Sequence, residues 1–184
     1  YFLMRGIKYN KIVSKLNFVL KNISEDKNIL EIGCGSKIYK DIFYQHNYYG
    51  LDKHKSEWVF NDDLPEFYCD IKNFNTDLKF DLIFSIATVY LFDEDSLSKF
   101  IELIKGLENT RGRCIIFDYR KKTIFKLGNN YNFYLEKLNK SFSKYMSIDE
   151  NYEWCSNNFL KNQVKKMFRG KINRTIITDI NFNL

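Results

Sequence analysis

The chain has 184 residues, of which 45% are hydrophobic and 17% aromatic, and its formal net charge is +6. This length and composition predict one globular domain with a sizeable core, and no internal repeat or low-complexity segment interrupts the sequence. No apolar run reaches the roughly 18 residues that a membrane helix needs, so we expect no membrane span.

The number and spacing of cysteines and histidines indicate whether disulfides or a metal site are expected. The four cysteines lie far apart with no C-x-x-C pair, and only two histidines occur. Reduced thiols, a cytoplasmic location and no metal site are therefore expected. The segment Tyr1–Arg5 is too short for a signal peptide.

Charge is uneven along the chain. From Tyr119 onward there are 13 Lys and Arg residues against 5 Asp and Glu residues, whereas residues 1–118 hold 16 against 18. A basic last third can face an anionic substrate such as a nucleic acid or a phosphosugar, or it can be an ordinary solvated surface.

Periodicity predicts alternating helices and strands over the first two thirds. Helices are expected at 8–23, 37–46 and 94–107, the last capped by Asp93. Strands are expected at 28–32, 48–52, 67–70, 79–86 and 113–118, with an irregular connection over 54–66. This strand–helix–strand alternation predicts a doubly wound, mostly parallel α/β sheet with helices on both faces.

The last third is harder to interpret. Part of 131–140 is expected to be helical. Ser147–Glu150 reads as a capping box and predicts a helix that continues through Tyr152 to Phe168. Residues 174–182 alternate apolar and polar side chains, which predicts a half-buried strand at or near an edge of the sheet.

Three predicted strands end in a carboxylate, at Glu31, Asp52 and Asp70. Because the carboxyl ends of parallel strands share one edge, these acids should line a single crevice. An acid one βαβ unit after the first strand, such as Asp52, can accept both hydroxyls of a ribose. Asp70 can hold an exocyclic amine, although a lone acid at a strand end is also a common turn former or helix cap.

A glycine turn follows the first of these strands, at Gly33 and Gly35. Glycine tolerates positive φ and leaves bare backbone facing a ligand. The third glycine of a dinucleotide-binding G-x-G-x-x-G is missing, since Ile38 stands there. Glu31 directly before the turn would also repel a pyrophosphate, so the pattern favours a cationic ligand.

In this order the motifs resemble the class I S-adenosylmethionine-dependent methyltransferases over residues 28–119. The matching stretches are Ile29–Gly35, Gly50–Asp52, Cys69–Ile71, Phe80–Ser85 and Gly112–Phe117. The resemblance implies a Rossmann-like fold with an antiparallel strand at its C-terminal edge. It divides the single domain into an N-terminal helix (1–27), a cofactor-binding core (28–119) and a variable substrate-side part (120–184).

The resemblance also implies S-adenosyl-L-methionine as cofactor. Glu31 and the glycines would hold its methionine end, Asp52 its ribose and Asp70 its adenine. The whole cofactor-binding set implied is Glu31, Gly33, Cys34, Gly35, Asp52, Lys53, Asp70, Ile71 and Ser85. The family often has a further glycine where this chain has Lys37, and we expect that side chain to point outward from a first helical turn.

Methyl transfer from a sulfonium needs alignment and exclusion of water, and it needs a base only if the acceptor must lose a proton early. Candidate catalytic residues near the strand edge are Tyr90, Asp118 and Tyr119.

The preferred acceptor is a small molecule or glycan. Two alternatives stay open: an RNA or protein methyltransferase, and a non-catalytic partner subunit of this fold. The sequence makes no prediction of oligomeric state.

Overall fold

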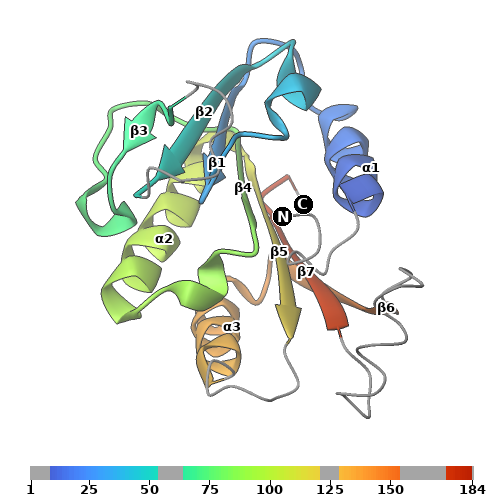
Figure 1. The fold of residues 1–184 in the computed structure, drawn as a ribbon, viewed down its shortest axis with the longest axis vertical. Helices are drawn as coiled ribbons and strands as arrows, with labels where there is room; N and C mark the ends of the chain where they lie inside the picture. The colour runs from blue at the N-terminus through green and yellow to red at the C-terminus, as the bar shows by residue number, and fades with distance from the viewer. Residues whose placement is uncertain (1–8, 54–63, 121–128, 154–172, 184) are drawn as a thin grey trace.

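The computed structural model describes residues 9–53, 64–120, 129–153 and 173–183. Within these ranges seven strands form one sheet in the order β3-β2-β1-β4-β5-β7-β6 (Figure 1). The strands are β1 (Asn28–Ile32), β2 (Asn47–Asp52), β3 (Phe67–Tyr68), β4 (Leu82–Ile86), β5 (Arg113–Arg120), β6 (Met146–Glu153) and β7 (Asn173–Asn181).

The described residues also form three α-helices and four short 3₁₀ helices, and the first α-helix precedes the first strand. They are α1 (Tyr9–Leu20), α2 (Glu94–Gly106) and α3 (Asn129–Phe142), with η1 (Lys40–Phe43), η2 (Ile71–Asn73), η3 (Val89–Leu91) and η4 (Leu107–Thr110). As predicted, Asp93 caps α2, because its Oδ1 accepts the Ser96 N–H at 2.9 Å. Over the part of the chain described, no helix combines the length and apolarity needed to cross a bilayer.

Strand direction creates a single switch point in the sheet. Strands β3, β2, β1, β4 and β5 are parallel, and β7 is antiparallel to both β5 and β6. The chain moves outward from β1 through β2 to β3, then returns to place β4 on the other side of β1. The predicted mostly parallel, doubly wound sheet is confirmed, and ligand sites in such sheets lie outside the carboxyl ends at the switch point.

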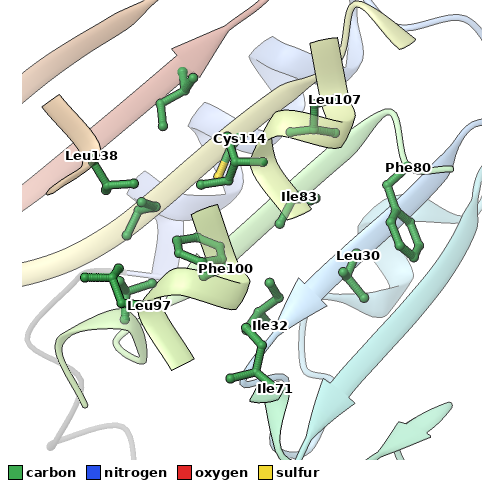
Figure 2. Close-up of a cluster of buried hydrophobic side chains, with 14 of the residues drawn as sticks. Leu30, Ile32, Ile71, Phe80, Ile83, Leu97, Phe100, Leu107, Cys114 and Leu138 are labelled. Carbon is green, nitrogen blue, oxygen red and sulfur yellow. The ribbon is translucent and has the colours of Figure 1, made fainter. Parts of the chain in front are cut away.

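Alternating side chains divide the core into two layers. On β1, Ile29 packs with α1 and η1 on one face, whereas Leu30 packs with α2 and α3 on the other. Figure 2 shows the second layer, in which Leu97 and Phe100 of α2 and Leu138 of α3 meet Ile83 and Cys114 of the central strands. Burial on both faces explains why the central strands read as continuous apolar runs.

The crossover helix expected at 37–46 is wrong. Turns lead from the end of β1 into the short helix η1, and β2 already begins at Asn47. Lys37 has a φ of 48°, a left-handed conformation that cannot belong to the first turn of a right-handed helix. Its side chain is buried, so the expectation that it points outward is also wrong.

The helix expected from Ser147 is wrong as well, over the residues described. Strand β6 instead pairs with β7 along its whole length, with Ile148 opposite Thr178. A capping box is a local signal, and here pairing with a distant strand overrides it. The remainder of that expected helix, beyond residue 153, lies outside the described residues.

The strand expected at 174–182 is confirmed as β7. The helix expected within 131–140 is confirmed as well, because α3 includes these residues. Because β6 occupies the outer position, β7 lies between β5 and β6. Strand β6 is the element that sequence reasoning missed. The sequence of β6 alternates apolar and polar side chains only weakly, and its one isoleucine, Ile148, is 44% exposed in the structure.

A buried ion pair fixes α1 and the last strand to the start of β5. Arg113 donates to both carboxylate oxygens of Asp179, from Nε at 2.7 Å and from Nη2 at 2.5 Å. Lys15 of α1 contacts the same carboxylate at 2.8 Å. Burial alone would raise the pKa of Asp179, but Arg113 and Lys15 outweigh it and lower that pKa.

We predict that Asp179→Asn destabilises the protein by about 2–3 kcal/mol at pH 7, because Arg113 and Lys15 lose the buried charge they neutralise. The native pKa of Asp179 is lowered, so this stabilisation is present above about pH 4 and is lost as the pH falls further. Urea unfolding at pH 7 and pH 3 measures both effects. The exposed Asp77→Asn is the control, and an equal loss at both pH values would contradict the prediction.

Candidate functional site

The first strand runs into a loop of left-handed residues. Gly33, Gly35 and Lys37 have φ angles of 73°, 53° and 48°. At Gly33 the glycine is also required by packing, because an added Cβ would lie 2.2 Å from Thr88 Oγ1, on the segment that leaves β4. The loop over Gly33–Lys37, which we call the glycine loop, therefore fits closely against the exit of β4.

Hydrogen bonds fasten the glycine loop to the end of β2. The N–H groups of Gly33 and Cys34 donate to the Leu51 carbonyl oxygen at 2.8 and 3.3 Å. The Gly35 N–H donates to Asp52 Oδ2 at 2.9 Å. The structure thus brings Asp52 directly beside the glycines, at the carboxyl edge of the sheet.

Asp70 lies farther along the same edge, just beyond β3. Its Oδ1 caps η2 by accepting the Lys72 N–H at 3.1 Å, and its Oδ2 pairs with Lys53 Nζ at 3.2 Å. The Lys72 N–H, followed by Lys53, lowers the pKa of Asp70. The carboxylate is therefore ionised at neutral pH, as an acceptor for an amine should be.

Glu31 differs from the other two acids because it is fully buried. The Tyr48 hydroxyl donates to its Oε2. Burial, and then the charge of Glu31, raise the pKa of the Tyr48 phenol, so Tyr48 stays a hydrogen-bond donor. The Glu31 carboxyl group is therefore closed to solvent.

The remaining members of the predicted set have structural contacts. Ser85 is buried at the end of β4, and its Oγ donates to the Ile32 carbonyl oxygen at 3.1 Å. Ile71 is buried in the same core layer as Leu51. Within the described ranges, no three His, Cys, Asp or Glu side chains gather as metal ligands would.

Cys34, in the middle of the glycine loop, lies among several charged side chains. Its pKa is raised strongly, first by burial and then by the negative charges of Glu31, Asp52 and Glu66, whereas Lys37 lowers it. Three carboxylates against one ammonium give the loop a negative potential. A cation is favoured there and a pyrophosphate is disfavoured.

Sequence reasoning missed Glu66. It follows Pro65 in the connection expected to be irregular, and its only signal is an acid directly before a strand. In the structure Glu66 Oε1 accepts Lys37 Nζ at 2.9 Å, and its Oε2 accepts the Gly50 N–H at 2.6 Å. Lys37 also donates to the Leu64 carbonyl oxygen at 2.7 Å.

The candidate catalytic residues divide by exposure. Asp118 of β5 is fully buried, and burial raises its pKa to about 7, although the Tyr134 hydroxyl and the Tyr90 N–H partly oppose this. Tyr90 on η3 is half-buried. Tyr119 follows Asp118 on β5, and its side chain lies outside the described residues.

Comparison with known proteins gives matches at the level of structure. No family model matches the chain, and no curated protein matches it in sequence. Many solved structures do match. Plantazolicin methyltransferase BamL, solved with a triazolic desmethylPZN analog and SAH, has a TM-score of 0.62 at 15% identity, over 95% of this chain and 84% of that one.

Two further structures show the same likeness. A TehB-like SAM-dependent methyltransferase from Corynebacterium glutamicum has a TM-score of 0.55 at 17% identity, over 96% of this chain and 91% of that one. Phosphoethanolamine N-methyltransferase 2 from Haemonchus contortus has a TM-score of 0.56 at 12% identity, over 91% of this chain and 52% of that one. The chain has the fold of the class I S-adenosylmethionine-dependent methyltransferases.

We predict that the stability of the parent protein falls with pH more steeply than that of Asp118→Asn. The folded-state pKa of Asp118, about 7, lies above its ordinary value of 3.8. The folded state therefore retains a proton that the unfolded chain releases, which costs about 1.4 kcal/mol per pH unit between those values. Denaturant unfolding from pH 4 to pH 8 should show the two curves diverging.

Tyr134→Phe sharpens this test. Removing the hydroxyl that lowers the pKa of Asp118 should extend the loss of stability to higher pH. Parallel curves for parent and Asp118→Asn would contradict a buried, neutral Asp118.

Proposed function

We propose that this chain is an S-adenosylmethionine-dependent methyltransferase acting on a small-molecule or glycan-like acceptor. One observation carries the proposal: a glycine loop in a negative potential is hydrogen-bonded to Asp52 where the strand order reverses. A sulfonium compound is cationic at its reactive centre, so this potential favours it. The same potential argues against the pyrophosphate of a dinucleotide.

The residues at this edge fit the parts of the cofactor. Asp52 is half-buried, so its carboxylate can accept ribose hydroxyls while staying beside Gly35. Asp70 can accept the amine of adenine. Gly33 and Gly35 can present backbone without side chains to the methionine end, and the buried Glu31 acts electrostatically on Cys34 between them.

When bound, S-adenosylmethionine supplies an electrophilic methyl group. The protein's task is then to hold the acceptor in line and to exclude water. Among the candidate residues, Tyr90 is half-buried beside the exit of β4, and we infer that it lines the acceptor side. Asp118 is fully buried, so we infer that it does not touch the acceptor.

Two of the neighbouring structures support a small-molecule acceptor. Structures of two neighbours contain small organic molecules together with SAH, a triazolic desmethylPZN analog and phosphomonomethylethanolamine. The basic last third of the chain favours a second candidate, an RNA acceptor. Radiolabelled methyl transfer to low-molecular-mass, RNA and protein fractions of one extract distinguishes them, and RNA binding would weaken steeply with salt.

We predict that S-adenosylmethionine raises the melting temperature and that NAD does not. A ligand at a hundred times its dissociation constant stabilises the folded state by about 2.7 kcal/mol. Differential scanning fluorimetry with each compound measures this. A shift with NAD alone would contradict the proposed function.

Asp52→Ala should weaken S-adenosylmethionine binding by roughly tenfold or more, because a charged acceptor contributes about 1.5–3 kcal/mol. Asp77→Ala, at an exposed position in the connection between η2 and β4, is the matched control and should bind as the parent does. Isothermal titration calorimetry gives both dissociation constants. Equal affinity of Asp52→Ala and the parent would rule out the ribose role.

A further inference from the structure

Lys37 occupies an unusual place for a lysine. Its φ of 48° is a conformation that favours glycine, and its side chain is only 1% exposed. Left-handed backbone and a buried ammonium each cost free energy, and both persist only where the surroundings hold them. The contacts of Lys37 should therefore explain why the chain retains it.

Those contacts form one connected network. Lys37 Nζ donates to Glu66 Oε1 at 2.9 Å and to the Leu64 carbonyl oxygen at 2.7 Å. The second oxygen of Glu66 accepts the Gly50 N–H at 2.6 Å. A single carboxylate thus joins the glycine loop to β2 and to the chain entering β3.

The Lys37–Glu66 pair lies against the middle of the glycine loop. A Cβ added at Gly50 would lie 2.7 Å from Cys34 Sγ and 3.2 Å from Glu66 Oε2, so these two side chains meet over Gly50. The Cys34 pKa responds to Glu66 and to Lys37 in opposite directions. Each charge of the pair is therefore felt within the loop.

We propose that the Lys37–Glu66 ion pair determines how strongly the glycine loop prefers S-adenosylmethionine over S-adenosylhomocysteine. This inference rests on the function proposed above. The two compounds share the adenosine and the amino-acid end, and they differ by one methyl group and the positive charge on sulfur. Intact, the pair is nearly neutral, whereas removing one partner leaves an uncompensated charge beside the loop.

The two single variants should shift the preference in opposite directions. Lys37→Gly leaves Glu66 unpaired, and the added negative potential should raise the affinity ratio of S-adenosylmethionine to S-adenosylhomocysteine by roughly three- to tenfold. Glu66→Gln leaves the ammonium unpaired and should lower the ratio by a similar factor. Combining both substitutions should return it close to the parent value.

Calorimetric titration of each purified full-length variant with both compounds gives the ratio directly. Lys37→Gly suits the left-handed backbone, and Glu66 has a side chain 31% exposed, so both variants are chosen to keep the fold. Lys99→Met is the control, because it breaks a pair of equal length, 2.9 Å, with Glu102 on α2. Its ratio should match that of the parent.

A ratio that stays constant while both affinities fall together would overturn the proposal, because it would mean that the pair only holds the loop in shape. A shift of the same sign in Lys37→Gly and Glu66→Gln would overturn it too. If the parent protein binds neither compound, the proposed function itself fails, and this result differs from a constant ratio.

Discussion

The conformation of the glycine loop is the constraint on which the site depends. Three left-handed residues in five positions turn the chain sharply at the end of β1, and no helix can begin before the turn is complete. The turn is held from two sides. Asp52 accepts the Gly35 N–H, and Glu66 ties Lys37 to the backbone of β2. Bare backbone is thereby fixed at the point where the strand order reverses, which is where ligands bind in sheets of this kind.

The charged side chains around the glycine loop determine which ligand the site favours. Glu31, Asp52 and Glu66 surround Cys34, and Lys37 compensates only part of their charge. Glu31 is buried and bonded to Tyr48, whereas Asp52 and Asp70 are only half-buried and remain accessible. The buried acid can therefore favour a cation, while the two accessible carboxylates accept hydrogen bonds from neutral donors.

The sequence predicts the sheet well because its signals are strong and local. Apolar runs such as 82–86 belong to strands buried on both faces, and Glu31 and Asp52 lie near the carboxyl ends of the neighbouring parallel strands β1 and β2, as expected. It fails where a distant contact decides. The buried side chain of Lys37 pairs with Glu66, 29 residues away, and β6 pairs with β7 in spite of a capping box at Ser147. Neither partner can be recognised from the residues themselves.

A crystal structure of the protein with S-adenosylhomocysteine tests the central claim most directly. The account predicts the ribose hydroxyls within hydrogen-bond distance of Asp52, the adenine beside Asp70, and the sulfur next to the backbone of Gly33–Gly35. A ligand bound elsewhere on the molecule, or bound at this edge without contact to Asp52, would contradict it.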